Sequence, residues 1–323
     1  MAIFPRRPGA PLNQATGKPC ASVLMAARNH EQYAAAAVAS VLEQDYEQLE
    51  LIAIDDASDD ATPDVLEQCA AEAPAGRMRV VRHSRQEGIA ETRAHALDLA
   101  RGEFIGLLDS DDLWLPGKVG PQVEILLSEP DVGLTHAEFE AFDSATGQRM
   151  PWGSRDWNRD ADPLVELVRL GCFVMTGTAL IRREAIERRG VGFENPGYQS
   201  YDDYLLFLTI ALDWRFAHEE RTVMRYRRHA GNLTNVLFAD NVPRARTKVL
   251  EDFLARFPEA RERLGTERRR TMARLLVAAA AQERNRDRAQ ATRFALAALR
   301  EHPPAALGEA GRAVRIRLGA RGR

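Results

Sequence analysis

The amino-acid sequence predicts an α/β fold with a mostly parallel sheet and helices on both of its faces. Apolar runs of strand length alternate with helical patterns over the first 130 residues. This alternation indicates parallel strands that are covered on both sides. Polar and acidic residues follow several of the apolar runs. Because doubly wound sheets bind ligands outside the carboxyl ends of their strands, this edge of the sheet is the candidate site.

The elements follow in a regular order. Strands are expected at 21–27, 49–55, 78–83 and 104–109, each followed by a helix, at 33–43, 63–73, 87–101 and 116–127. From Val132 the pattern becomes looser, with a strand expected at 178–181 and a helix at 203–212. Beyond Asp240 only helices are expected, at 242–257, 266–282, 288–300 and 305–318.

The composition is that of an ordinary globular protein. Of the 323 residues, 45% are hydrophobic and 28% are charged, and the formal net charge is -3. This balance gives no reason to expect nucleic acid as a partner. The last part of the chain differs, because from Asn241 onward about 20 basic residues stand against about 9 acidic ones.

The cysteines and the apolar segments predict a cytoplasmic protein. Three widely spaced cysteines fit neither a disulfide framework nor a zinc site built on cysteines. Residues 1–18 lack the apolar run of a signal peptide, and no stretch approaches the roughly 18 apolar residues of a membrane span. We therefore expect a chain that does not cross the membrane.

The first chemical motif is a pair of carboxylates at the end of the expected strand 49–55. Asp55 and Asp56 stand where the chain leaves the sheet, and Asp59 and Asp60 follow as candidates for capping the next helix. A carboxylate at a strand end can accept hydrogen bonds from a nucleotide base or from the hydroxyls of a ribose. Asp55 or Asp56 is therefore a candidate nucleotide contact.

The second motif follows the expected strand 104–109, where three carboxylates fall within four residues: Asp109, Asp111 and Asp112. In an extended segment the side chains of Asp109 and Asp111 point the same way, so both can reach one cation. Hard oxygen ligands suit Mg²⁺ or Mn²⁺, which complete their shells with water and substrate phosphates. A helix cap before Pro116 is the simpler alternative, although a cap needs only one acid.

Five segments together resemble the family 2 glycosyltransferases of the GT-A fold. They are Ser22-Val-Leu-Met-Ala-Ala-Arg28-Asn29, Ile54-Asp55-Asp56-Ala57-Ser58, Gly88-Ile-Ala-Glu-Thr-Arg93, residues 100–112 with Asp109-Ser110-Asp111-Asp112, and Tyr226-Arg-Arg-His229. The similarity covers roughly residues 21–235, and five segments in the right order and spacing are a specific signal. The chain departs from the family where it has Ala26 in place of a frequent Pro and Ala94 in place of a frequent Asn, but neither change removes a charged group.

The resemblance implies a site for the donor, a nucleotide diphosphate sugar. It implies that Asp55 or Asp56 contacts the base and ribose, that Ala26 lines the base pocket, and that Arg93 contacts the diphosphate or the uridine. Arg28, Asp109 and Ser110 complete the expected donor site. A UDP sugar is the expected donor, followed by a dTDP sugar.

The resemblance also implies a divalent metal, Mn²⁺ or Mg²⁺. The metal is expected at the Asp109-Ser110-Asp111 motif, with Asp111 as the principal ligand. His229 can join the metal or hold the diphosphate, and a purely structural role remains open for it. The other histidines, including His83, His95 and His218, show no partner pattern and are assigned no role.

An acidic pair that opens the expected helix 203–212 provides the candidate base. Inverting transfer needs a carboxylate that takes a proton from the acceptor hydroxyl. The family usually has Glu-Asp at this place, with the second acid as the base, and this chain has Asp202-Asp203. The resemblance therefore implies Asp203 as the base and Asp202 as a residue that orients the loop or the acceptor. Helix capping by one of the two acids is the alternative.

These inferences divide the chain into a flexible leader at 1–18, a GT-A domain at 19–240 and a helical region at 241–323. Within the domain, a donor half extends to about 130 and an acceptor half begins at about 131. The expected acceptor is a growing glycan or a lipid-linked glycan. The basic C-terminus, with Arg312, Arg315, Arg317, Arg321 and Arg323, is a candidate for peripheral contact with an anionic membrane at its inner face.

Two other functions share parts of this pattern. A sugar-phosphate nucleotidyltransferase would have the same sheet and metal carboxylates, but no Gly-rich phosphate loop with a following lysine stands near the first strand. A non-catalytic subunit that binds a nucleotide sugar would not need intact acids at Asp109, Asp111 and Asp203. Turnover of the donor by purified protein distinguishes the three functions.

Overall fold

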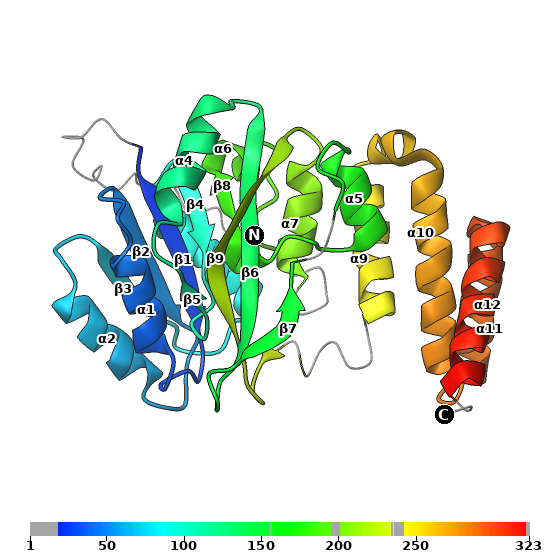
Figure 1. The fold of residues 1–323 in the computed structure, drawn as a ribbon, viewed down its shortest axis with the longest axis horizontal. Helices are drawn as coiled ribbons and strands as arrows, with labels where there is room; N and C mark the ends of the chain where they lie inside the picture. Colours follow the sequence, from blue (N-terminus) through cyan, green and yellow to red (C-terminus); the bar gives the residue numbers. More distant parts are fainter. Residues whose placement is uncertain (1–18, 155–156, 195–200, 234, 236–241, 321–323) are drawn as a thin grey trace.

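One large sheet with helices on both faces forms the body of the molecule (Figure 1). The computed structural model describes residues 19–154, 157–194, 201–233, 235 and 242–320. Four strands at one end of the sheet are parallel to one another: β3 (Met78–Arg82), β2 (Leu49–Asp55), β1 (Ala21–Ala27) and β4 (Phe104–Leu107). The predicted doubly wound arrangement is therefore confirmed in this part of the chain.

The second part of the sheet mixes directions. β8 (Leu180–Arg182) is antiparallel to β4 and to β6 (Val132–Asp143). The long strand β9 (Arg215–Arg228) runs parallel to β6 and pairs with the short β5 (Leu113–Trp114), while β7 (Arg149–Gly153) pairs with β6 outside this path. The sheet order is β3-β2-β1-β4-β8-β6-β9-β5.

Successive residues of the strands point to opposite faces of the sheet, and each face has its own apolar core. Val23 and Leu51 belong to one core, whereas Leu24 and Ile52 belong to the other. The first core takes residues from helices α1 (Ala34–Leu42), α2 (Thr62–Glu72) and α4 (Val119–Ser128). The second takes residues from α3 (Ile89–Leu99), α5 (Pro163–Leu170), α6 (Arg183–Glu187) and α7 (Asp202–Ile210).

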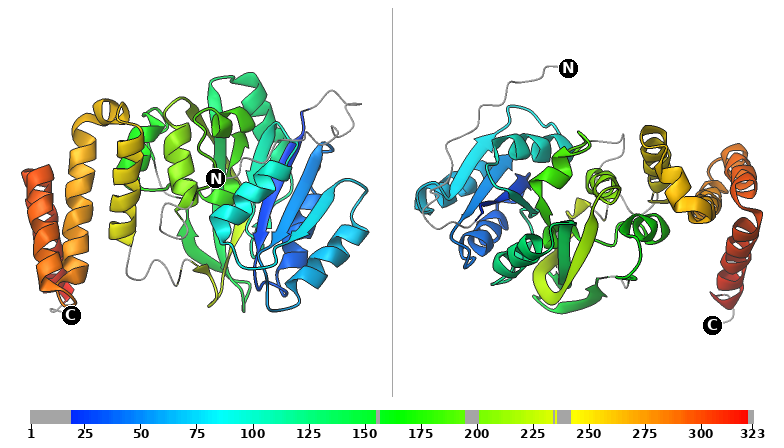
Figure 2. Two further views of the ribbon diagram at one scale, coloured as in Figure 1. Left: turned by 180° about the vertical axis from the view of Figure 1, so that it is seen from behind. Right: turned by 90° about the horizontal axis from the view of Figure 1, so that it is seen from above.

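The C-terminal helices extend from one end of this body (Figures 1 and 2). They are α9 (Val242–Arg256), α10 (Ala260–Glu283), α11 (Arg288–Glu301) and α12 (Pro303–Ala320). Phe253 of α9 and Leu264 of α10 join the second core, whereas Ala273, Ala298 and Ala306 form a small cluster between α10, α11 and α12. The predicted helices are confirmed, and the domain boundary at residue 240 stays a prediction.

β1 and β2 have the predicted bounds, but β4 ends two residues before its expected end. The chain turns after Leu108, and the backbone N–H of Asp112 donates a hydrogen bond to the Asp109 carbonyl over 3.0 Å. Within the described residues, none of the helices has the length and apolar character needed to span a membrane.

Candidate active site

A cavity of about 890 Å³ opens at the carboxyl ends of the parallel strands. Its lining comes from the ends of β1 and β2, the first turns of α3, the turn at 109–111, strands β6 and β7, the segment 170–176, the start of α7, and the end of β9 with the chain after it. Sheet topology thus brings together residues that are far apart in the sequence, as the strand-end rule predicts.

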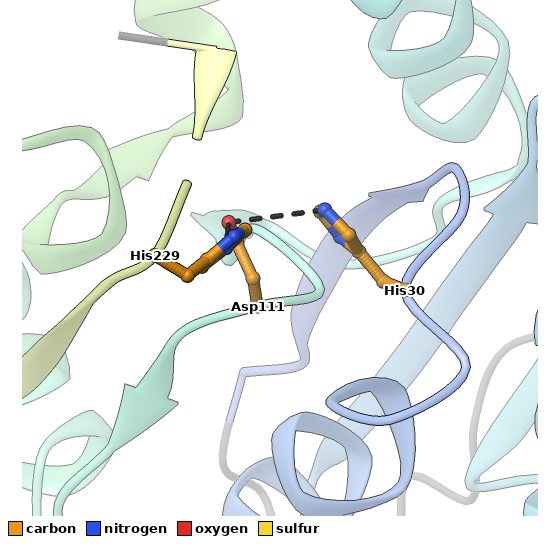
Figure 3. A group of neighbouring side chains, drawn as sticks. All are labelled: His30, Asp111 and His229. Carbon is orange, nitrogen blue, oxygen red and sulfur yellow. Dashed lines mark hydrogen bonds and ion pairs between the residues drawn. The ribbon is translucent and has the colours of Figure 1, made fainter. Parts of the chain in front are cut away.

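Asp111 is the centre of a cluster with His30 and His229 (Figure 3). The three side chains offer ligand atoms that all lie within 4.8 Å of one another. Nε2 of His229 lies 3.0 Å from Oδ2 of Asp111, and Nε2 of His30 lies 3.9 Å from the same oxygen. Burial raises the pKa of Asp111, but the hydrogen bond to His229 and the charges of both imidazoles lower it below its usual value.

Asp109 is not a member of this cluster, and its expected role as a metal ligand stays a prediction. Residues 109–112 form a turn, so the alternation of side chains in a strand does not apply there. Oδ1 of Asp109 instead accepts a hydrogen bond of 2.7 Å from Nη2 of Arg93. Among the described residues, the third member of the cluster is His30, whose Nδ1 lies 2.7 Å from Oγ of Ser110.

Arg93 joins the two halves of the cavity. Its side chain is 5% exposed, and Nη1 donates to Oδ2 of Asp202 over 2.9 Å, in addition to the bond of Nη2 with Asp109. Burial lowers the pKa of Arg93, but Asp202 and Asp109 outweigh burial and raise it, so the guanidinium stays charged. Asp202 is buried, and its Oδ1 has no hydrogen-bond partner among the described residues.

Asp203 faces the cavity next to this pair. Oγ1 of Thr176 donates to its Oδ2 over 2.5 Å, and the backbone N–H of Tyr204 donates to its Oδ1 over 2.6 Å. Burial and the charge of Asp202 raise the pKa of Asp203 to about 6, although Arg93 and Thr176 act in the opposite direction. A carboxylate whose pKa lies close to neutrality is well suited to take up a proton.

The two acids at the end of β2 have different environments. Asp55 is fully buried, accepts a hydrogen bond from the backbone N–H of Ser58, and is not part of the cavity lining. Asp56 lines the cavity, and its carboxylate accepts from the backbone N–H groups of Glu87 and Gly88 over 2.8 and 2.9 Å. Burial raises the pKa of Asp56, whereas these bonds and the one to His83 lower it. Of the two alternatives, Asp56 is the one in position to contact a ligand.

Arg28 and Ala26 line the same end of the cavity. Nη1 of Arg28 donates to the backbone carbonyls of Asp56 and Ala57 over 2.6 and 2.5 Å. The guanidinium group therefore fixes the loop after β2. Ala57 in that loop has a φ of 55°, in the left-handed region that residues other than glycine rarely adopt.

Three histidines of the site were not predicted. His83 has Nδ1 3.0 Å from Oδ1 of Asp56 and Nε2 3.0 Å from Nδ1 of His95, which makes a chain from the cavity to α3. His30 joins the Asp111 cluster. The signal that could have found His30 and His83 is their position, because each follows the end of a parallel strand, where ligand contacts gather. His95 offered no such signal.

The family is decided by residues 22–190, which match the model described as glycosyl transferase family 2. This chain belongs to that family. It is 28% identical over 195 residues to a protein of Escherichia coli named UDP-Glc:alpha-D-GlcNAc-diphosphoundecaprenol beta-1,3-glucosyltransferase WfgD, covering 59% of this chain and 70% of that one. The chain spans about half the length of the first curated relatives that it matches.

Solved structures confirm the fold of this family 2 chain as GT-A. TarS 1-349 of S. aureus, in complex with UDP-GlcNAc, aligns with 90% of this chain and 79% of its own, with a TM-score of 0.62 and 16% identity. The mannosyltransferase PcManGT of Pyrobaculum calidifontis, in complex with GDP-Man and Mn2+, aligns with 96% of this chain and 84% of its own, with a TM-score of 0.54 and 22% identity.

Proposed function

We propose that this family 2 glycosyltransferase transfers a sugar from a nucleotide diphosphate donor to an acceptor hydroxyl, with inversion at the anomeric carbon. The observation that carries the proposal is that Asp203 and Asp111 line the same cavity. Asp203 offers a base of raised pKa, and Asp111 forms a cluster with two imidazoles. Membership of the family supports the reaction class.

The donor is expected to lie along the carboxyl ends of β1, β2 and β4. Asp56 would accept hydrogen bonds from the base or ribose, beside Ala26 and Arg28, and Ser110 would border the diphosphate. Arg93 is buried between two carboxylates and supplies positive charge close to the expected diphosphate. A UDP sugar is the proposed donor, and the complex of TarS with UDP-GlcNAc is consistent with this choice.

Asp111, His229 and His30 are the residues that would hold a divalent metal. Two imidazole nitrogens and one carboxylate oxygen within 4.8 Å of one another fit Mn²⁺ better than Mg²⁺, which prefers oxygen ligands. When bound, such an ion would neutralise charge on the diphosphate. The Mn2+ in the PcManGT complex supports divalent metal use. Asp109 would hold the guanidinium group of Arg93 in place and would not be a metal ligand.

The proton transfer is assigned to Asp203. Thr176 and the N–H of Tyr204 each take one lone pair of the carboxylate, which leaves further lone pairs to accept a proton from the acceptor hydroxyl. Asp202 is engaged with Arg93 and holds the guanidinium in place. Each acid of the pair therefore has one role, Asp203 as the base and Asp202 as a positioning residue.

A glycan on a lipid carrier is the proposed acceptor, at the inner face of the membrane in the cytoplasm. The apolar residues Leu170, Val174, Leu233 and Val242 line the same cavity as Asp203, and the name of WfgD specifies a diphosphoundecaprenol acceptor. Anionic lipid attracts a basic segment by roughly 1 kcal/mol per residue. The side chain of Arg312 is 69% exposed, whereas those of Arg315, Arg317, Arg321 and Arg323 lie outside the described residues.

The assay that tests the proposed function measures release of the nucleoside diphosphate and formation of product from a panel of nucleotide sugars. Chelation should abolish transfer, and manganese should restore it. Asp111→Asn should raise the manganese concentration needed for half-maximal activity by at least roughly tenfold. Full activity in excess chelator would refute the metal dependence, and synthesis of a nucleotide sugar from a sugar phosphate would favour a nucleotidyltransferase.

Asp112→Asn is the matched control for Asp111→Asn. Asp112 is buried and accepts a hydrogen bond from the backbone N–H of Arg227 over 2.8 Å. Burial raises its pKa well above the usual value, and Asp111 and Asp109 raise it further. A neutral amide can accept the same bond, so Asp112→Asn should leave the manganese requirement close to that of the native chain.

Membrane contact is tested separately by sedimentation with vesicles of phosphatidylglycerol and phosphatidylcholine. The full chain should bind the anionic vesicles more tightly than a chain that ends at Pro304, and salt should weaken the difference. Equal binding by the two chains would remove the C-terminus as the contact.

A further inference from the structure

An exposed tryptophan stands on one wall of the cavity. Trp152 belongs to β7, which pairs with β6, and its relative exposure is 43%. Two buried rings hold the indole. Its centroid lies 4.9 Å from that of Tyr226 at 86° and 5.5 Å from that of Phe139 at 87°. All three rings line the cavity that contains Asp203 and Asp111.

This arrangement fixes the indole without burying it. Perpendicular ring pairs at these distances are favourable, and they restrict the rotation of Trp152. The guanidinium carbon of Arg228 lies 5.5 Å from the indole centroid and adds a further contact. Exposure of a large apolar ring to water is unfavourable in free energy. A ring that is held in place and still exposed inside a cavity is therefore suited to bind a ligand that covers it.

The wall formed by Trp152, Tyr226 and Phe139 is connected to the Asp111 cluster through β9. Tyr226 precedes Arg227, whose Nε donates to the backbone carbonyl of Asp111 over 2.7 Å, and His229 contacts the carboxylate of the same residue. Trp152 therefore stands beside the strand that leads into the charged cluster. The proposed base contact Asp56 lies at the end of β2. In the sheet, β1, β4 and β8 lie between β2 and β6. The wall is thus separated from the nucleotide end of the cavity.

We propose that Trp152 is the platform on which the acceptor sugar stacks. Pyranose rings carry C–H groups on their faces and hydroxyls around their rims, so an indole can cover one face while the hydroxyls stay free for polar residues of the cavity, of which Asp203 is one. The ligand class is a pyranose residue of the acceptor glycan. That the stacked sugar belongs to the acceptor rests on the proposed function. The stacking of a sugar on Trp152 does not.

Saturation-transfer NMR measures the stacking without turnover. The probes are the octyl glycosides of glucose, galactose, N-acetylglucosamine and rhamnose, each with the protein in the presence of UDP and magnesium, a diamagnetic ion that does not broaden the signals. For at least one glycoside, saturation should concentrate on the C–H groups of one face of the ring. Trp152→Ala should reduce that signal by roughly three- to tenfold, and Trp152→Phe should retain part of it.

Leu296→Ala is the matched control, because Leu296 is 51% exposed on α11, outside the cavity lining. It should give the native signal. Equal saturation with Trp152→Ala and Leu296→Ala would overturn the proposal, and so would the absence of face-selective saturation from all four glycosides with the native chain.

Binding of the donor sugar is read in parallel from the further increase in melting temperature that UDP-glucose, UDP-galactose and UDP-N-acetylglucosamine give beyond UDP alone, each with manganese. If Trp152→Ala loses this increase together with the glycoside signal, the platform belongs to the donor sugar and the assignment to the acceptor is wrong. If donor turnover is never found but the glycoside signal depends on Trp152, the proposed function fails and the sugar platform stands.

Discussion

The two halves of the cavity are constructed in different ways. At the proposed donor end, charged side chains bond to the backbone close to the strand ends: Asp56 accepts from two N–H groups, and Arg28 donates to two carbonyls. At the proposed acceptor end, side chains from distant elements contact one another: Thr176 bonds to Asp203, and Trp152 packs on Tyr226. Changes at the donor end should therefore mainly affect donor binding, whereas changes at the acceptor end should mainly affect turnover.

The largest effect is expected from Asp203→Asn. The amide cannot take the proton, so transfer should fall by at least roughly 10²-fold, the loss typical of removing a general base. Burial and Asp202 disfavour the charged form of this residue, so the neutral variant should not melt at a lower temperature near pH 7. Calorimetry should find native donor affinity. Transfer at the native rate would place the base elsewhere.

The pH dependence of transfer should show the same group. The base is active when it is deprotonated, and the pKa of Asp203 is raised to about 6. The value of kcat/KM should therefore fall about tenfold per pH unit below about 6 and level off above it. The measurement is a profile from pH 4.5 to 8 under manganese saturation, with circular dichroism at each pH as the control for unfolding. A flat profile would contradict the assignment.

Asp202→Asn should have a smaller effect on the rate and a larger one on stability. It removes the charge that faces Arg93 in the buried pair, although the amide oxygen can still accept a hydrogen bond. Transfer should fall about tenfold, as expected for weakening one bond to a charged group. The melting temperature should fall, in contrast to Asp203→Asn. A reversal of these two patterns would exchange the roles of the two acids.

The smallest effect is expected at the donor end, from His83→Gln. Asp56 would keep its two backbone donors, so the donor KM should rise only about threefold and kcat should stay within a factor of two. His95→Gln, which removes the outer member of the same chain, should change the donor KM less. A loss of kcat with an unaltered donor KM would contradict the division between the two halves.

The donor half was the more predictable part because its signals are local. The apolar runs 21–27 and 49–55 fix β1 and β2, and position at a strand end marked the pair Asp55 and Asp56, of which Asp56 lines the cavity. The turn at 109–112 could not be predicted from alternation, since its hydrogen bond competes with continuation of the strand. The role proposed for Trp152 could not be predicted from the sequence, because it depends on contacts with Tyr226 and Phe139, which the sheet brings together from β9 and β6.

The bond between Arg93 and Asp202 has a consequence for exchanging parts between relatives. These residues are 109 positions apart and come from opposite sides of the proposed boundary near residue 130. A chimera that takes its acceptor half from another family 2 protein would combine an arginine from one parent with an acid from the other. Because the pair is buried, water could not solvate the two charges if the acid side chain were too short or too long to reach the arginine. Donor and acceptor specificities should therefore recombine only between parents that share both residues, which restricts how readily such enzymes can be reassembled from parts.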